Sequence, residues 1–362
     1  MWYHEPMSTH EVKVVRIESI LPHPNADALE LTNVWGYQCV IRKGAHNVGD
    51  LMVFIEPDYT IPLNRNEFKF LDDGKGKSRQ RITMRRFRGE PSYGLLIPAP
   101  EGSVEGDNVM EQLGVERYEP PAPKGFGMAS GVQAKGPDIP VPHYDLESFK
   151  KYHKLFNEGE RVILTEKIHG TNARYVFHNG EMFCGSRTTW KMKPGTHVKD
   201  VTWIDENGIE VTKTITAPDC VWWTALEQNH WIEEWCKNHP SMAIYGEVYG
   251  PSIQGSDFHY GKSQGQYGFA AFDILDHGRW VDNADMFDNP VYCAGICETV
   301  PVLYRGALDA SMLEKLAEED SCFPKQKVRE GIVVKLERGE RFDSRHGRVA
   351  LKYVSDRYLC MK

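Results

Sequence analysis

Short runs of β-branched and aromatic residues fill the first hundred positions of the chain, and clusters of Gly, Pro, Asn and Asp separate them. The clearest runs are VKVVRIESI, LTNVWGYQCVIR, LMVFIEPDYTIP and YGLLIPA. Strand-length runs that alternate with turn residues are typical of a small closed sheet. They predict an all-β barrel over residues 1–118.

A proline-rich segment interrupts this pattern. Residues 118–145 contain six prolines and several glycines, and their apolar positions follow neither the helical nor the strand period. Such a composition favours a linker between domains. We therefore expect a barrel domain at 1–118, a linker at 119–145 and a second domain at 146–362.

Strand-like and helix-like patterns alternate after the linker. The runs RVILTEK, MAIYGEVYG, YGFAAFDIL, EGIVVKL and RVALKYV predict strands, and Asn179-Gly180 predicts a tight hairpin turn. Helices are expected at residues 146–156, 225–237 and 309–319. The polar run VKDVTWIDENGIEVTKT is expected to form a surface hairpin. Together these elements predict an α+β domain with largely antiparallel sheets.

Composition narrows the cellular setting. The 362 residues are 41% hydrophobic and 26% charged, as in a globular protein. No apolar run approaches the roughly 20 residues that span a bilayer, and the N-terminus carries no secretion signal. The eight cysteines include no CxxC pair, so we expect them to be reduced. These features predict a cytoplasmic protein without a membrane partner.

The net charge of −8 hides a basic stretch in the predicted barrel domain. Residues 65–88 contain nine Lys or Arg and three acidic residues, with three phenylalanines interleaved. Cations of this density suit contact with nucleic-acid phosphates, although a solvated basic loop explains them equally well. The candidate nucleic-acid contacts are Arg79, Arg81, Arg85, Arg86 and Arg88.

An ordered set of short motifs carries the chemical signal of the second domain. It begins with the hexapeptide KIHGTN at 167–172, where a lysine precedes a glycine that permits a tight turn. By itself Lys-x-[Asp/His]-Gly is weak, because chance supplies it about 0.1 to 0.3 times in such a chain. The later motifs are Ser186-Arg187, Tyr245-Gly246-Glu247, Phe272-Asp273-Ile274, EGIVVK at 330–335 and Leu351-Lys352.

In this order the motifs resemble the covalent nucleotidyltransferase superfamily of polynucleotide ligases and capping enzymes. The form KIHGTN and the layout are most similar to RNA ligases of the second and fifth families. The stretch beginning HPNAD resembles an OB fold of the tRNA-binding type, and an OB domain ahead of the catalytic domain is similar to family five. The resemblance implies an OB barrel followed by an α+β nucleotidyltransferase domain with ATP-grasp-like antiparallel sheets.

The resemblance also implies a role for each motif residue. Lys167 would attack the α-phosphate of ATP and carry AMP. Glu247 and Glu330 would bind Mg²⁺ or Mn²⁺. The residues implied in nucleotide binding are Glu166 and Phe272 at the adenine, Asn172 and Arg187 at the ribose and phosphate, Glu247, and Lys335 and Lys352 at the α-phosphate. Two departures from the family pattern are His169, where most members have Asp, and the single lysine of the last motif, for which Arg348 would partly substitute.

The function so implied is that of an ATP-dependent RNA ligase active in RNA repair. It would join 5′-phosphate and 3′-hydroxyl ends through a lysyl-AMP intermediate, acting as a monomer on RNA or on a nicked duplex with RNA on the 3′-hydroxyl side. The alternatives are a DNA ligase or capping-type nucleotidyltransferase, and a non-catalytic RNA-binding protein that uses its OB module.

Overall fold

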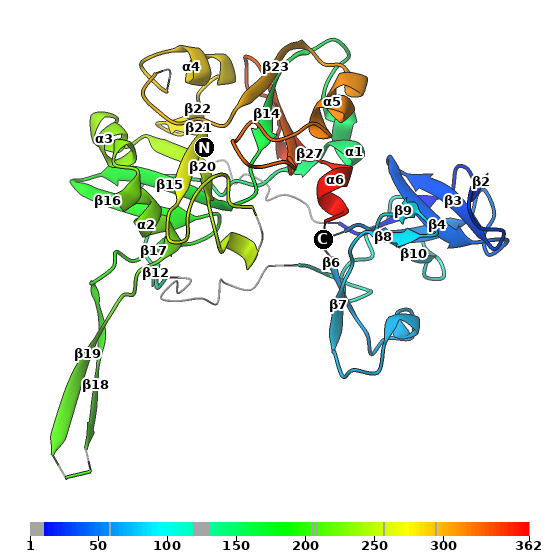
Figure 1. Cartoon of the computed structure of the whole chain (residues 1–362), viewed down its shortest axis with the longest axis horizontal. Coiled ribbons are helices and arrows are strands. Elements are labelled where there is room, and N and C mark those ends of the chain that lie inside the picture. Colours follow the sequence, from blue (N-terminus) through cyan, green and yellow to red (C-terminus); the bar gives the residue numbers. More distant parts are fainter. Residues whose placement is uncertain are drawn as a thin grey trace. The chain divides into compact units, whose positions relative to one another are not determined.

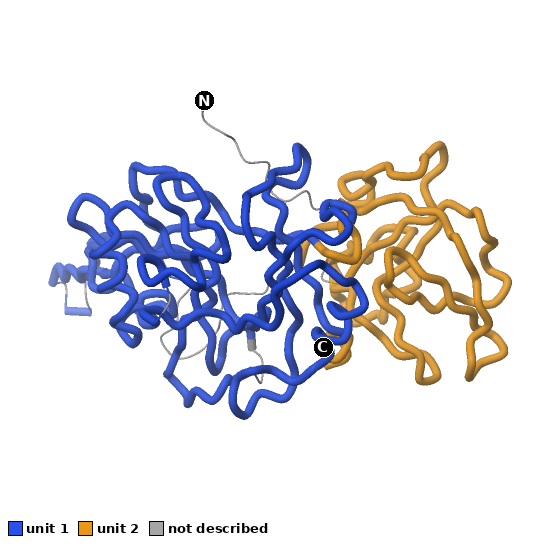
Figure 2. The backbone as a smooth tube through the Cα atoms, turned by 90° about the horizontal axis from the view of Figure 1, so that it is seen from above, with its two compact units in different colours: residues 1–7, 120–147, 154–355 blue, residues 8–119, 148–153, 356–362 orange. Residues whose placement is uncertain are grey.

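The computed structural model describes residues 11–57, 59–118, 131–204, 206–207, 209–255, 258–293 and 295–361. They form two compact units, coloured separately in Figure 2. Residues 11–118, 148–153 and 356–361 make the N-terminal unit, and residues 131–147 and 154–355 make the C-terminal unit. Two short segments of the expected second domain thus belong to the N-terminal unit. No helix in the described part of the chain is long and apolar enough to cross a membrane.

Short antiparallel strands build the N-terminal unit, as their turn-bounded apolar runs predict. They are β1 (Lys13–Arg16), β2 (Leu21–Pro22), β3 (Leu29–Val34), β4 (Tyr37–Arg42), β5 (Leu51–Ile55), β6 (Tyr59–Pro62), β7 (Arg79–Arg81), β8 (Arg85–Phe87), β9 (Glu90–Ser92), β10 (Leu95–Pro98) and β11 (Glu116–Arg117). The inward side chains of β1, β5, β6 and β10 form a continuous apolar core that includes Val14, Val53, Ile61 and Ile97. The short helices η1 (Lys69–Leu71), α1 (Phe149–Tyr152) and α6 (Asp356–Leu359) complete the unit.

A seven-stranded sheet forms one half of the C-terminal unit (Figure 1). In spatial order its strands are β12 (Gln133–Ala134), β17 (Trp190–Lys191), β16 (Glu181–Ser186), β15 (Thr171–His178), β20 (Ala243–Tyr249), β21 (Gly268–Asp276) and β22 (Arg279–Trp280). One face packs on the helices α2 (Val221–Gln228), α3 (Trp231–Asn238) and α4 (Asn283–Asp288). Apolar side chains cover both faces of the central strands, which explains their near-continuous hydrophobic runs.

A five-stranded sheet forms the other half. Its spatial order is β13 (Glu147–Ser148), β27 (Ala350–Val354), β24 (Gly331–Leu336), β14 (Arg161–Lys167) and β23 (Val302–Ala307). The helix α5 (Ala310–Ala317) contacts β24 and β27. Its N-terminus is capped by Asp309, whose carboxylate accepts a bond from the backbone N–H of Ser311 at 2.8 Å. The remaining short elements are η2 (His153–Leu155), η3 (Ile253–Gly255), β25 (Phe342–Asp343) and β26 (Gly347–Arg348).

The helix expected at 225–237 is divided in the structure. Asn229 ends α2 with non-helical backbone angles, and α3 starts two residues later. The side-chain amide of Asn229 donates to the carbonyls of Ala225 at 2.7 Å and Tyr267 at 3.1 Å. Its side chain therefore competes with the helix for backbone partners, which is why asparagine disfavours helix interiors.

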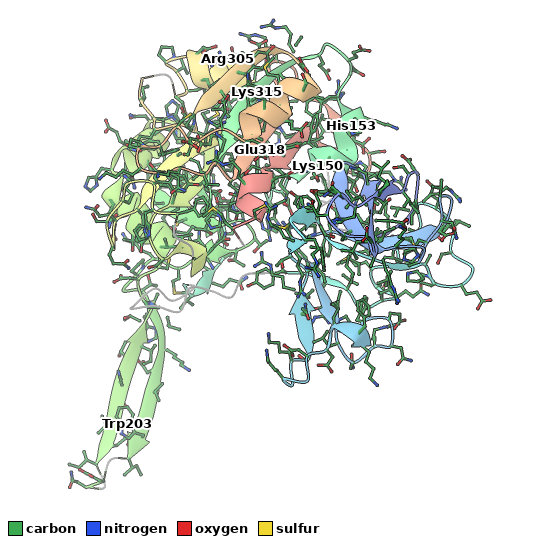
Figure 3. All side chains as sticks on the ribbon, turned by 45° about the vertical axis from the view of Figure 1, so that its right-hand side comes forward. Lys150, His153, Trp203, Arg305, Lys315 and Glu318 are labelled. Carbon is green, nitrogen blue, oxygen red and sulfur yellow. The ribbon has the colours of Figure 1, made fainter. Side chains whose placement is uncertain are left out.

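A long two-stranded hairpin extends from the C-terminal unit (Figure 1). It consists of β18 (His197–Ile204) and β19 (Glu210–Thr216), as the polar run predicted. Most of its side chains are exposed, and Trp203 lies near its far end (Figure 3). The indole of Trp203 is 43% exposed.

Candidate active site

Strand register places three lysines of the motif set on one face of the five-stranded sheet. Lys167 lies opposite Gly331 in the β14–β24 pair, and Lys352 lies opposite Val333 in the β24–β27 pair. Directly opposed residues share a face, and residues two apart on a strand do so too. Lys167, Lys352 and Lys335 therefore belong to one face, whereas Glu166 belongs to the other.

The ammonium of Lys167 is paired with the carboxylate of Glu330. The Nζ–Oε2 distance is 2.9 Å, and Lys167 keeps part of its side chain exposed while Glu330 is buried. His169 Nδ1 lies 3.8 Å from the same oxygen. The backbone N–H of His169 donates to the hydroxyl of Tyr260 at 2.7 Å, and its ring packs on Phe258 at 4.8 Å. The turn that follows Lys167 is thus held by an aromatic wall.

Asn172 and Glu247 contribute a second wall from the seven-stranded sheet. They are opposed in the β15–β20 pair and share a face. Gly170 brings the two walls together, because a Cβ at this position would lie 2.2 Å from the carbonyl oxygen of Val248 and 2.8 Å from Cγ of Glu247. Only glycine permits this approach, which explains its place three residues after Lys167.

The donors on these walls fit a hard divalent cation. Burial raises the pKa of Glu247 to about 8, a shift that the charge of Lys167 opposes and the charge of Glu330 reinforces. Asn172 Oδ1 is buried and has no hydrogen-bond partner among the described residues. A bound cation would offset the cost of burying the Glu247 carboxylate in its charged form. It would also accept Asn172 Oδ1 as a ligand. The described residues contain no group of three or more His, Cys, Asp or Glu arranged for a metal, so phosphate oxygens and waters would complete the coordination.

Lys335 has a different environment from the one the resemblance implies. It is 2% exposed; its Nζ lies 2.8 Å from Asp273 Oδ2 and also donates to the carbonyl of Phe272. Arg348 reaches the same carboxylate at 2.9 Å. Burial alone would raise the pKa of Asp273, but the charges of Arg348 and Lys335 outweigh it and lower this pKa. Lys335 thus ties β24 to β21, and its proposed contact with the α-phosphate would have to be made alongside these bonds.

The residues just before β13 lie against the predicted nucleotide site. The ring of Tyr144 packs on Phe272 with centroids 4.7 Å apart, and its hydroxyl donates to Asp273 at 2.5 Å. Asp145 lies 3.5 Å from Arg187 Nη1. Tyr144 and Asp273 were both missed as site residues. Asp273 stands inside a recognised motif, whereas no local pattern marks Tyr144.

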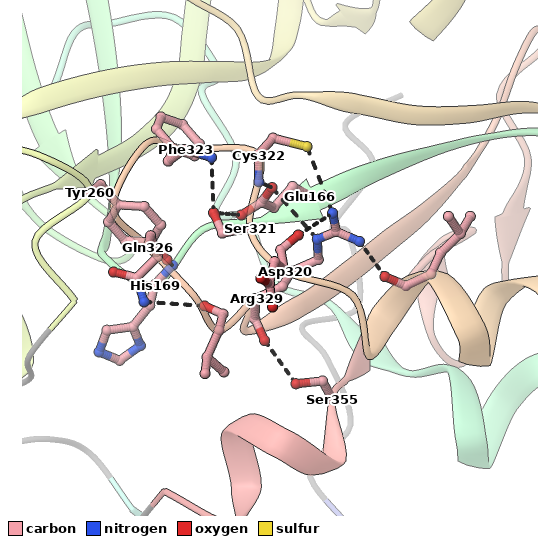
Figure 4. Close-up of polar contacts among 12 residues, drawn as sticks. Glu166, His169, Tyr260, Asp320, Ser321, Cys322, Phe323, Gln326, Arg329 and Ser355 are labelled. Carbon is pink, nitrogen blue, oxygen red and sulfur yellow. Dashed lines mark hydrogen bonds and ion pairs between the residues drawn. The ribbon is translucent and has the colours of Figure 1, made fainter.

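Glu166 lies in a buried network behind Lys167 (Figure 4). Its carboxylate accepts bonds from the Ser321 hydroxyl at 2.5 Å and the Cys322 backbone N–H at 2.8 Å, and Arg329 Nε lies 3.6 Å away. The resemblance implies that Glu166 contacts adenine. In the structure its carboxylate bonds to Ser321 and Cys322 on the face of the sheet opposite Lys167. Glu166 and Arg329 precede Lys167 and Glu330 directly, so the network fixes the backbone on which the reactive pair is mounted.

The five arginines predicted to contact nucleic acid have distinct surroundings in the N-terminal unit. Arg79 is held by the carbonyls of Thr60 at 3.0 Å and Gly114 at 2.8 Å. The other four are Arg81, whose guanidinium stacks 3.9 Å from the Tyr118 ring; Arg85, which is exposed; Arg86, which donates to the Gly89 carbonyl at 2.9 Å; and Arg88, which is exposed at a turn. Arg79 thus supports the barrel, while Arg85 and Arg88 face solvent.

Two family models match the chain. One, described as RNA ligase, covers residues 160–354, more than half of the chain and every motif of the candidate site. The other, an OB-fold domain, covers residues 11–99. A search of curated proteins found no match. The two matches confirm the predicted order of an OB barrel followed by an α+β domain.

Solved structures of an RNA ligase from Naegleria gruberi are similar in fold. A mutant with AMP and Mn gives a TM-score of 0.73 at 24% identity, over 97% of this chain and 98% of that one. A second mutant, with ATP and Mn, gives 0.73 at 23% identity with the same coverage. The ligase with PPi gives 0.72 at 23% identity, again over 97% and 98%. These similarities extend over both units.

Proposed function

The chain belongs to the RNA ligase family, and from this premise we propose that it seals RNA ends with ATP through an AMP carried on Lys167. The observation that carries the proposal is the reactive pair of Lys167 and Glu330 at 2.9 Å, facing Asn172 and Glu247 across a glycine contact. Transfer of AMP needs this geometry because the amine must reach phosphorus beside carboxylates that suit a divalent cation.

The first step joins AMP to the protein. The neutral Nζ of Lys167 attacks the α-phosphorus of ATP, a P–N bond forms, and the bond to pyrophosphate breaks. Glu247 and Glu330 would hold Mg²⁺ or Mn²⁺, whose positive charge would offset the phosphates and favour the neutral amine. Lys352, on the same face as Lys167, stabilises the α-phosphate, and Phe272 and Arg187 contact the nucleotide. Glu166 supports Lys167 from the opposite face of the sheet, and Lys335 ties β24 to β21 through Asp273.

Two further steps seal the strand. An oxygen of the RNA 5′-phosphate attacks the AMP phosphorus, so that the P–N bond breaks and Lys167 regains its proton. The 3′-hydroxyl then attacks the activated 5′-phosphorus, a phosphodiester forms, and AMP leaves. We place the substrate among nicked duplexes with RNA on the 3′-hydroxyl side, as the resemblance to RNA ligases of the fifth family implies.

A strand-sealing assay tests this proposal. A nicked duplex with a labelled 5′-phosphate is expected to be sealed with ATP and Mn²⁺ but not with GTP, and a nick with a DNA 3′-hydroxyl end is expected to react at least about tenfold more slowly. Equal sealing of both nicks would indicate a DNA ligase. Failure to seal any nick, together with no transfer of AMP to the protein, would leave an RNA-binding protein.

Gly170 provides a test of the site geometry. Gly170→Ala places a Cβ against the Val248 carbonyl, so the turn that holds Lys167 must move. Since a displacement of about 1 Å can cost about 100-fold in rate, we expect transfer of AMP to Lys167 to slow by about that factor. Single-turnover labelling with ATP measures it. Gly159→Ala is the control: it adds a Cβ at an exposed turn of the same unit where no atom lies within 4 Å, so its φ of +70° strains only that turn, and the variant should keep the wild-type rate. A normal rate for Gly170→Ala would show that the close approach does not position the lysine.

A further inference from the structure

The N-terminal unit contains a cavity of about 290 Å³. Its walls come from β4, η1, β7, β8 and β10, so it lies on the barrel itself. Small-ligand sites begin at about 300 Å³. The cavity therefore suits a single ring system and is too small for a double helix.

Two exposed phenylalanines stand at this cavity. Phe70 is 66% exposed and Phe87 is 41% exposed, whereas Phe68, the third phenylalanine of the basic stretch, is buried in the barrel core. Two exposed apolar rings beside one hollow offer a surface on which a ligand can pack. A planar ligand could stack on either ring.

The charge of the lining specifies the kind of ligand. Arg42, Arg81, Arg85 and His46 line the cavity, and none of its described lining residues is an aspartate or glutamate. In the amide orientation that satisfies both neighbours, Gln80 donates to the Leu71 carbonyl at 3.2 Å and accepts from Arg85 Nη2 at 2.9 Å. This contact anchors Arg85 at the cavity. Aromatic rings among cations without acids complement a nucleotide with its phosphate.

We propose that this cavity binds one unpaired base of the RNA, stacked on Phe87 or Phe70, with the adjoining phosphate on Arg85 and Arg42. The inference rests on the proposed function, because the RNA ligase activity supplies the ligand. Bases inside a duplex are stacked on each other and cannot enter so small a space. The cavity would therefore favour nicked duplexes that carry an unpaired nucleotide beside the strand break.

The test is the binding of a single-stranded RNA oligonucleotide that contains 2-aminopurine, whose fluorescence is quenched when the base stacks. The full-length protein is titrated at fixed salt as wild type and as Phe70→Ala/Phe87→Ala. We expect the wild type to quench the probe, and the double variant to lose the quench and bind at least about tenfold more weakly. Phe342→Ala removes a phenylalanine of similar exposure, 51%, from the C-terminal unit and should bind as the wild type does.

Two further measurements make the result specific. Arg85→Gln should lower the slope of log affinity against log salt by about 0.7, the value for one phosphate contact on a single strand. A fully paired duplex of the same sequence should quench with neither protein. Unchanged binding by the double variant, or an equal quench with the duplex, would overturn the proposal.

Labelling with ATP separates this proposal from the ligase function. The double variant should acquire AMP at the wild-type rate, because both phenylalanines lie on the barrel unit. If the wild type never acquires AMP yet quenches the probe, the ligase proposal fails and the base site stands. If the wild type acquires AMP and the double variant still quenches, the base site fails alone.

Discussion

Replacing Lys167 with alanine is expected to abolish the gain of one AMP in mass that the wild-type protein shows after incubation with ATP and a divalent cation. Nothing else in the site offers an amine at the same place: Lys335 is buried against Asp273, and Lys352 stands two strands away on β27. Loss of a nucleophile that forms the covalent intermediate lowers a rate by about 10⁶-fold, so the adduct should be undetectable. Intact-mass spectrometry measures the gain directly.

Two companion variants separate chemistry from folding. Lys167→Arg keeps a cation beside Glu330 but cannot lose its proton, so it should fold normally and acquire no AMP. Lys193→Ala removes an exposed lysine of the same unit and should acquire AMP as the wild type does. If Lys167→Ala still acquired AMP and peptide mapping located the adduct on another lysine, that lysine and not Lys167 would be the nucleophile.

Asp273→Ala is expected to lower the free energy of unfolding of the C-terminal unit by about 3–5 kcal/mol. The carboxylate of Asp273 is fully buried and holds Lys335, Arg348 and the Tyr144 hydroxyl. Without it the buried ammonium of Lys335 loses its carboxylate partner, and the half-buried Arg348 keeps Glu340 at 2.6 Å. Urea denaturation followed by tryptophan fluorescence measures the loss.

An exposed salt bridge and the pH dependence of stability provide the controls for the Asp273→Ala prediction. Asp288→Ala breaks an exposed pair with Arg305 in the same unit and should cost no more than about 1 kcal/mol. Because the folded-state pKa of Asp273 is lowered, its contribution is present above the unfolded pKa of about 3.9 and is lost as the pH falls through the folded value. The difference between wild type and Asp273→Ala should thus persist at neutral pH and shrink only in acid. A loss below 1 kcal/mol would show that the cluster contributes little.

The sequence predicted the fold well where the signal was local. Alternating apolar runs and turn residues indicated the barrel strands, and the strand-like runs after the linker indicated the antiparallel sheets of the second domain. The break at Asn229 was readable from its low preference for helix interiors but was outweighed by the apolar stripe of Trp231, Ile232 and Trp235. Segments 148–153 and 356–361 group with the N-terminal unit through tertiary packing, which no local pattern reveals.

The site was predictable in part for the same reason. The pairing of Lys167 with Glu330 follows from two strands that end side by side, and strand alternation alone indicates that Glu166 points away from Lys167. By contrast, the engagement of Lys335 by Asp273 joins two different sheets, and no pattern within either strand reveals it. Tyr144 is similar, since it reaches Phe272 from a proline-rich segment without periodicity.

The β18–β19 hairpin is a place where other segments can be inserted into the chain. Its first and last residues, His197 and Thr216, are paired, and just outside them Gly195 donates to the Ala217 carbonyl at 2.9 Å. The chain therefore leaves and re-enters the C-terminal unit at almost one point. The two strands between these points carry few buried side chains. Such a closed stem is a natural site for exchange: a fluorescent label, an affinity tag or a foreign loop inserted there would leave the register of β15, β16 and β20 untouched.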